Sequence, residues 1–273
     1  MQQHELARCM DWAAQEGWNP GLHDAQTFHA TDRQGFLLAE WDGEAVGMIS
    51  AVRYGADFGF IGFYLVRAAY RGHGHGLSLW NAGMAHLQGR VVGLDGVVAQ
   101  QDNYRKSGFA LAYNNRRMQG LACAAGPTHD ALFRLRAQDL PRLARYDAAM
   151  FPVERATFLQ HWIQQTGSIA WGMEQQGELC GYGVIRPCRS GFKIGPLFAD
   201  STEVAAHIFR GLMGSVPAGE QVQFDISALH AEARALALDW PMQTVFETAR
   251  MYVGTPPVMD LRRQFGITTF ELG

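Results

Sequence analysis

The chain has 273 residues, of which 48% are hydrophobic and 18% charged, a balance typical of a globular protein with one large or two ordinary domains. Its formal net charge of −3 gives no general basic field, which argues against nucleic acid or an anionic membrane as a partner. The four cysteines form no C-x-x-C pair and no stretch has the pattern of a signal peptide or membrane span, so we expect a cytoplasmic protein without a zinc knuckle or disulfide framework.

Apolar periodicity and turn residues predict a regular series of elements in the first 120 residues. The dipeptide Asp42-Gly43 is the strongest local signal, because it favours the tight turn of a β-hairpin. Asp24 is expected to cap the second helix. In chain order, the predicted elements are helices over 4–16 and 24–32, strands over 35–41, 44–55 and 58–66, a helix over 76–88, a strand over 91–98 and a strand through 113–118. The predicted elements combine hairpins with one crossover connection, in which a helix joins two strands. This combination predicts a mixed sheet with helices on both faces.

The second half of the sequence repeats features of the first at a nearly constant offset. The segment WDGEAVG at 41–47 recurs as QQGELCG 134 positions later, and FALAYNNRRM at 109–118 recurs as MQTVFETARM 133 positions later. Two distant anchors that agree on one shift predict two copies of one fold. Gly126 and Pro127 interrupt any regular element, so the predicted domains are 1–125 and 126–273.

The first copy is expected to lack a first strand. ALFRLRA at 131–137 is predicted to form a strand, but its counterpart in the first copy would fall before residue 4. The sheet edge beside residues 36–41 should therefore be uncovered or be covered by another segment, because an open edge invites pairing. An ordered strand formed there by residues 1–5 would contradict this expectation.

The stretch RGHGHG at 71–76 joins the central strand to the helix that follows it. Glycines at 72, 74 and 76 let the backbone N–H groups of residues 72–77 approach an anion at a helix N-terminus, and Arg71 offers a forked cation. A turn without a ligand is an equal alternative. A dinucleotide fingerprint, supported by Asp95, would need a glycine at position 77, where Leu77 stands.

Metal binding at this loop is not expected. His73 and His75 would need further ligands at a matching spacing.

Two motifs in the first half carry a family resemblance. The pattern R-x-x-G-x-G at Arg71, Gly74 and Gly76, followed by Y-x-x-x-G-F at Tyr104, resembles the GNAT superfamily of acetyl-CoA-dependent N-acetyltransferases. The likeness is good over residues 1–120 and faint over the second half. The segments EGWNPGLHDAQTF and QFGITTFELG further resemble a bacterial subgroup with two fused GNAT-like halves. The resemblance implies an α/β (α+β) protein of tandem GNAT-like folds, each a mixed, mostly antiparallel sheet flanked by helices.

The resemblance also implies a site for acetyl-CoA. The amides of residues 72–77 would hold the pyrophosphate, and the strand residues would pair with the pantetheine arm, with a backbone N–H near Val66 stabilising the oxyanion. Val97 and Gln100 stand where the family often has Asn and Ala, so Asn103 or Gln101 is expected to replace the usual Asn contact. The implied cofactor-binding residues are Leu65, Val66, Arg67, Arg71, Gly72, His73, Gly74, His75, Gly76, Leu77 and Asn103.

The chemistry of N-acetyl transfer requires an acid and a base. A tyrosine hydroxyl can protonate a leaving thiolate, and the resemblance gives Tyr104 this role. A carboxylate should accept the proton of the amine, for which Glu16 and Asp95 are the candidates. Trp12, Trp18 and Phe28 are candidates for the walls of the amine pocket, although aromatic residues at helical spacing are more often part of a core.

The predicted function is therefore acetyl-CoA-dependent N-acetyl transfer to a primary amine of a small molecule, by direct attack through a tetrahedral intermediate. A catalytically inactive CoA-binding module, or a nucleotide-binding protein, is the alternative. The identity of the amine and the oligomeric state, with a homodimer among the options, are open.

The second copy is predicted to be degenerate. The positions that match Arg71, Gly74 and Gly76 lie inside STEVAAHIFRGLM, which has the pattern of an amphipathic helix, and the position of Tyr104 falls on Ala237 or Leu238. We therefore expect the second copy to have a structural or substrate-shaping role.

Overall fold

The computed structural model describes residues 1–123 and 129–273, so the predicted division at Gly126 and Pro127 lies outside the described residues. The elements of the first half follow the predicted order closely. They are α1 (Gln3–Gln15), α2 (Asp24–Thr31), β1 (Phe36–Trp41), β2 (Glu44–Tyr54), β3 (Phe58–Val66), the short 3-10 turn η1 (Ala68–Tyr70), α3 (His75–His86), β4 (Val91–Val97), η2 (Val98–Gln100), α4 (Gln101–Lys106) and β5 (Ala110–Leu121).

The second half repeats this order with one additional strand at its start and one at its end. Its elements are β6 (Leu132–Arg134), η3 (Ala137–Asp139), α5 (Leu140–Asp147), α6 (Ala156–Ile163), β7 (Ile169–Gln175), β8 (Glu178–Pro187), β9 (Phe192–Ala199), α7 (Thr202–Met213), β10 (Gln221–Ser227), α8 (Ala231–Asp239), β11 (Gln243–Val253), η4 (Leu261–Arg263) and β12 (Gln264–Gly266). The repeated hairpins turn in the same way, because Asp42-Gly43 and Gln176-Gly177 all have positive φ. The predicted helix STEVAAHIFRGLM is confirmed as α7.

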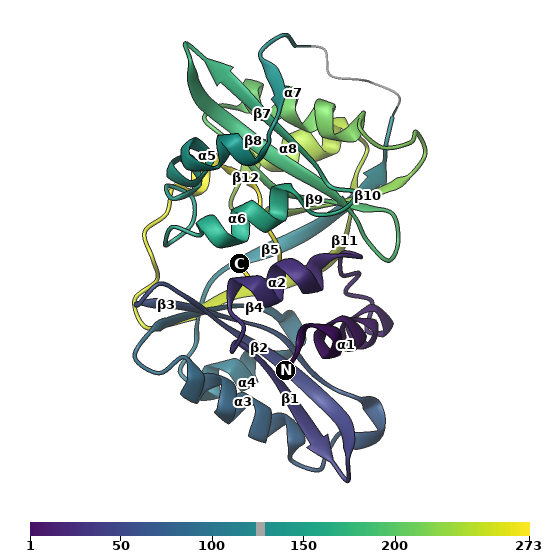
Figure 1. The fold of residues 1–273 in the computed structure, drawn as a ribbon, viewed down its shortest axis with the longest axis vertical. Helices are drawn as coiled ribbons and strands as arrows, with labels where there is room; N and C mark the ends of the chain where they lie inside the picture. The colour runs from purple at the N-terminus through teal and green to yellow at the C-terminus, as the bar shows by residue number, and fades with distance from the viewer. Residues whose placement is uncertain (124–128) are drawn as a thin grey trace.

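All strands belong to one sheet, in which the two halves exchange their last long strands. The order is β1-β2-β3-β4-β11-β5-β10-β9-β8-β7-β6, with β12 paired to β9. Two neighbouring pairs, β3 with β4 and β9 with β10, are parallel, and the other pairs are antiparallel. Strand β11 of the second half lies between β4 and β5 of the first, and β5 pairs with β10 of the second half. The mixed, mostly antiparallel sheet is thus continuous from one half to the other (Figure 1).

Helices cover both faces of the sheet, as predicted. One hydrophobic cluster joins α1 and α2 of the first half to α5 and α6 of the second, and the ring of Phe28 stacks on Trp162 with centroids 6.1 Å apart. On the other face, α3 packs over the first half and α7 and α8 over the second, each on a cluster of its own (Figure 1). The strand exchange also places Ala249 and Met251 of β11 in the cluster under α3, and Met118 of β5 in the cluster under α7 and α8, so the halves share buried core on both faces. Among the described residues, no helix is long and apolar enough to cross a bilayer.

The edge of the sheet at β1 has the form expected from the sequence. Residues 3–15 form a helix, residues 1–5 form no strand, and among the described strands β1 pairs with β2 alone. The N-terminal amine of Met1 donates a hydrogen bond to the carbonyl of Phe36 at 3.1 Å, so it occupies one acceptor near this edge. In the second half, β6 covers the corresponding edge by pairing with β7.

The predicted N-cap role of Asp24 is wrong. Asp24 is the first residue of α2, His23 precedes it as the N-cap, and the Asp24 carboxylate accepts the N–H of Gly21 at 2.8 Å. It also accepts two hydrogen bonds from the Arg186 guanidinium at 2.9 and 3.2 Å. The Asp24 carboxylate is directed away from the helix because the buried guanidinium of Arg186, in the second half, needs a negatively charged partner.

Candidate functional site

The central strands β3 and β4 separate at one end and leave a cavity between them. They pair from Phe58 and Val91 as far as Ile61 and Leu94, and the ladder ends there. A cavity of about 600 Å³ opens beyond this point, walled by residues 61–66 of β3, residues 94–97 of β4 and part of α4. Phe63 has a φ of 43°, which a bulky residue rarely adopts, at the place where β3 leaves β4.

The glycine-rich turn before α3 presents unused backbone donors near this cavity. Gly72 and Gly74 have φ of 84° and 87°, and Gly74 is the N-cap of α3. In the described part of the chain, the N–H groups of residues 72–77 have no hydrogen-bond acceptor. A Cβ at Gly72 or Gly74 would meet no atom within 4 Å, so the space outside these amides is open. Positive helix-end charge, free donors and open space together suit an anion.

The residues predicted to flank the cofactor are only partly brought together. Leu65, Val66, Arg71 and Leu77 line the cavity. Arg67 does not, because its N–H donates to Val46 and its guanidinium donates to the carbonyl of Ala45 at 2.8 Å.

Arg71 is already paired in this structure. Its Nε donates to the carbonyl of Val66 at 2.8 Å, and its Nη2 makes a short ion pair with Glu16. Glu16, predicted as a possible base, is therefore held outside the cavity wall by Arg71.

The histidines of the turn show no metal site. His73 is exposed, His75 packs against Trp41 with ring centroids 5.3 Å apart, and the two imidazole rings are 6.3 Å apart. Within residues 1–123 and 129–273, no group of three or more potential ligands could hold a metal ion.

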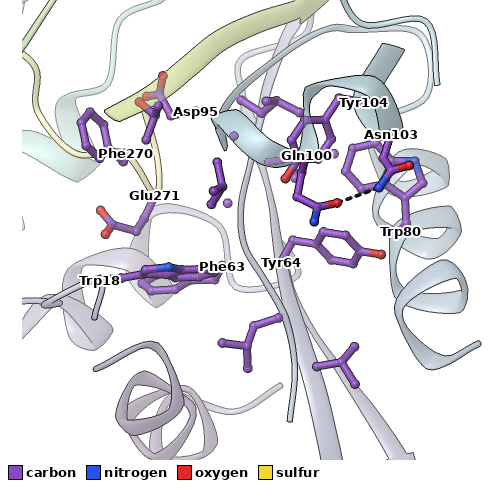
Figure 2. Close-up of a pocket in the computed structure, with 18 of the residues that line it drawn as sticks. Trp18, Phe63, Tyr64, Trp80, Asp95, Gln100, Asn103, Tyr104, Phe270 and Glu271 are labelled. Atoms are coloured by element: carbon purple, nitrogen blue, oxygen red, sulfur yellow. Dashed lines mark hydrogen bonds between the residues drawn. The ribbon is translucent and has the colours of Figure 1, made fainter. Parts of the chain in front are cut away.

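Tyr104 lies in the cavity wall on α4. Its ring packs against Gly96, where a Cβ would fall 2.2 Å from the ring, and against Trp80 with centroids 5.6 Å apart. Burial raises the pKa of Tyr104 to about 12. Its hydroxyl has no hydrogen-bond partner among the described residues and is not sealed from the cavity. Asn103 and Gln100 line the same wall, and Asn103 donates to the Gln100 side chain at 2.6 Å (Figure 2).

Asp95 lines the cavity but both of its carboxylate oxygens are occupied. Oδ1 accepts from Asn115 at 2.7 Å and from Arg250 Nε at 2.8 Å, and Oδ2 accepts from Arg250 Nη2 at 2.6 Å. Burial raises the pKa of Asp95, while Arg250 and Asn115 oppose the change. The negative charge of Asp95 raises the pKa of Arg250 well above its ordinary value. Asp95 therefore holds β4 to β11, and its fully buried carboxylate already accepts three hydrogen bonds, which makes it a poor acceptor for a substrate proton.

The far end of the cavity is aromatic and is built from both halves. Trp18 and Phe63 come from the first half, and Phe246 and Phe270 come from β11 and the segment after β12. Glu271 joins them, and Figure 2 shows it on the opposite side of the cavity from Tyr104. This end has the composition of a pocket for an organic acceptor.

The second half also holds the loop that carries Trp18. Asn19 donates to the carbonyl of Ser190 at 2.9 Å, and the Ser190 N–H returns a bond to the Asn19 side chain at 2.9 Å. Buried Lys193 of β9 donates to the carbonyl of Asn19 at 3.0 Å. These bonds fix the first half's loop against β8 and β9.

Comparison with known proteins gives the family. Residues 4–110 match a model described as acetyltransferase (GNAT) family, and residues 143–266 match one described as acetyltransferase (GNAT) domain. A holothin acyltransferase from Pseudoalteromonas sp. is 30% identical over 263 residues, which are 96% of this chain and 90% of the relative. The chain belongs to the GNAT family. It is an acyltransferase with two GNAT domains, as its sequence motifs indicated.

Solved structures share the GNAT fold across both halves. A putative acetyltransferase from Pyrococcus horikoshii superposes with a TM-score of 0.79 at 22% identity, over 92% of this chain and 85% of that one. A tandem GNAT protein from the clavulanic acid biosynthesis pathway superposes with a TM-score of 0.60 at 11% identity, over 93% of this chain and 96% of that one. The predicted tandem α/β fold is thereby confirmed.

Sequence reasoning identified part of the wall of this GNAT cavity. Trp18 lines it as anticipated, whereas Phe28 is fully buried in the core and Trp12 packs at the edge of that core. Phe270 and Glu271 were not anticipated. Their only sequence signal is TTFELG, whose Thr and Glu are two residues apart and suit a local hydroxyl-to-backbone turn.

Proposed function

We propose that this GNAT acyltransferase transfers an acetyl group from acetyl-CoA to a primary amine of a small molecule by direct attack. One observation carries the proposal: a single cavity is lined by Arg71 and Leu77 of the amide-rich turn, by Tyr104 and by aromatic residues of both halves. The similarity to a holothin acyltransferase supports transfer of an acyl group.

The turn before α3 fits the phosphates of CoA. Six consecutive N–H groups without acceptors in the described chain, at residues 72–77, suit a pyrophosphate at a helix N-terminus. Gly72 and Gly74 have no Cβ, which permits their positive φ and leaves that surface unobstructed. Leu65, Val66 and Leu77 would flank the pantetheine arm, with Asn103 and Gln100 as polar partners.

Tyr104 would supply the proton that the departing sulfur requires. Because burial raises its pKa to about 12, the hydroxyl is protonated throughout the neutral range. Its accessible position in the wall leaves the hydroxyl free to donate. The second half would shape the acceptor end through the loop of Trp18 and through Phe246 and Phe270.

Two measurements test the proposal. Native mass spectrometry and calorimetry should show that the purified protein binds CoA. Incubation with acetyl-CoA and a panel of primary amines should release free thiol together with an acetylated product detected by mass. Absence of CoA binding would remove the turn from the site, and thiol release without an acetylated amine would contradict transfer to nitrogen.

A further inference from the structure

Residues 268–273 cross between the two halves and form part of the cavity wall. The carbonyl of Glu271 lies against β3, so closely that a Cβ at Gly62 would fall 2.1 Å from it. Tyr54 donates to the carbonyl of Leu272 at 3.1 Å, and Ser50 donates to that of Glu271 at 3.4 Å. The backbone of this segment is therefore fixed on the sheet of the first half, and the direction of the Glu271 side chain is fixed with it.

The Glu271 carboxylate is held by one oxygen and open at the other. Thr269 donates its hydroxyl to Glu271 Oε2 at 2.5 Å, and the same hydroxyl oxygen accepts the N–H groups of Glu271 and Leu272 at 2.8 and 3.2 Å. Across the described residues, Oε1 has no hydrogen-bond partner, and it is not among the polar atoms sealed from solvent. The residue is only 5% exposed, so the accessible surface of Oε1 belongs to the cavity.

Glu271 is the carboxylate best placed to act in this cavity. Only Glu271 and Asp95 line it among the acidic side chains of residues 1–123 and 129–273. Asp95 gives both oxygens to Arg250 and Asn115. Glu16 is paired with Arg71 outside the wall.

The surroundings of Glu271 suit a cation with an aromatic or apolar body. Trp18, Phe63 and Phe270 surround the same end of the cavity (Figure 2). Aromatic faces and a carboxylate together attract an organic ammonium group.

Three buried cations also lie near Glu271. Arg117 is paired with Asp225 and Arg186 with Asp24, whereas Lys193 forms no ion pair in the described chain. Burial and Arg117 lower the pKa of Lys193, and the charge of Glu271 opposes that change. A charge-balancing role beside Lys193 is therefore the competing explanation that an experiment must separate from catalysis.

We propose that Glu271 binds the ammonium group of the acceptor and accepts its proton, as a catalytic residue of the transfer. The inference rests on the proposed function. Oε1 takes one proton from the ammonium group, which frees the nitrogen lone pair, and passes that proton to solvent. The nitrogen then attacks the thioester carbon, which forms the C–N bond and moves the carbonyl π electrons onto oxygen, and the C–S bond breaks when this tetrahedral intermediate re-forms the carbonyl. The sulfur takes the proton of Tyr104, and the second proton shed by the nitrogen returns to Tyr104 through solvent.

The test compares Glu271→Gln with the parent, using acetyl-CoA and two nucleophiles. Tryptamine has a primary ammonium group on an aromatic body, whereas hydroxylamine is unprotonated at neutral pH and needs little help from a base. We expect Glu271→Gln to lower single-turnover transfer to tryptamine by roughly 10²–10⁴-fold and transfer to hydroxylamine by less than about tenfold. Calorimetric affinity for tryptamine should fall about tenfold or more, because a hydrogen bond to a charge is lost. Affinity for CoA should be unchanged.

Glu247→Gln is the matched control, because Glu247 is exposed on β11, pairs with Arg116 of β5 and does not line the cavity. Parent-like transfer to tryptamine by Glu271→Gln, or an equal loss with both nucleophiles, would overturn the proposal and leave the charge-balancing role. If Glu271→Gln does not fold, Glu271→Asp keeps the charge near Lys193 but withdraws the carboxylate, and it should give the same selective loss. A parent that binds CoA but acetylates neither nucleophile would refute the proposed function and this inference together.

Discussion

The Asp95–Arg250 pair should be one of the strongest single contributions to the joining of the two halves. Asp95 is fully buried and Arg250 is 7% exposed, and they are direct partners in the register of β4 and β11. Asp95→Asn removes the charge and leaves the Arg250 guanidinium uncompensated. Breaking a buried pair in this way costs about 3–5 kcal/mol. In a chain of this size, 1 kcal/mol shifts the melting temperature by about 2–4 °C, so we expect a decrease of roughly 6–20 °C.

Denaturant unfolding followed by far-UV circular dichroism would measure the change in the free energy of unfolding. Glu247→Gln breaks an ion pair to Arg116 across β5 and β11, at 2.9 Å but exposed to solvent, and should cost at most about 1 kcal/mol. Replacing both buried partners, as Asp95→Leu with Arg250→Met, should recover most of the loss because no unpaired charge is left. A cost below about 1 kcal/mol for Asp95→Asn would show that the pair does not secure β11.

Three further expectations follow from the cavity. Gly74→Val forces a β-branched residue into a φ of 87° and should weaken CoA binding at least about tenfold, about 1.4 kcal/mol. Gly89→Val, at a φ of 82° away from the cavity, should leave CoA affinity unchanged. Equal calorimetric affinity for CoA in both variants would exclude the turn from the CoA site. Tyr104→Phe should retain CoA affinity and lower single-turnover transfer by roughly 10²–10⁴-fold, and because the parent hydroxyl has its pKa raised to about 12, the parent's rate should show no loss from Tyr104 ionisation up to about pH 10. Transfer at the parent rate would make Tyr104 a packing residue only. Gly62→Ala should place a methyl group 2.1 Å from the Glu271 carbonyl and destabilise the fold by about 1–3 kcal/mol, and an unchanged unfolding midpoint would show that the segment can move aside.

The elements of the fold could be predicted because their signals are local. Asp42-Gly43 specifies a hairpin within a few residues, and the amphipathic pattern at 202–213 specifies a helix whichever strand it packs on. The exchange of β5 and β11 could not be predicted. Both strands have similar patterns in the two copies, so either could pair within its own half or with the other, and tertiary packing decides.

The residues of the candidate site likewise include some that local sequence motifs identify and others that depend on distant contacts. The glycine turn and Tyr104 were identified because each belongs to a short motif within one segment. Asp95 was predicted as a candidate base because its partner Arg250, 155 residues away, is not apparent from the sequence. Glu271 was missed because nothing in the sequence places residues 268–273 against Gly62.

The order of the strands has a consequence for how the protein is made. Strand β4 leaves the ribosome 155 residues before its partner in β11, as the separation of Asp95 and Arg250 shows. At about 5–20 residues per second, the interval is roughly 8–30 s. During that time the side of β4 that will receive β11 has no native partner, and the first half cannot complete its own sheet. The nascent chain must therefore keep an apolar strand edge from pairing wrongly until β11 has been synthesised.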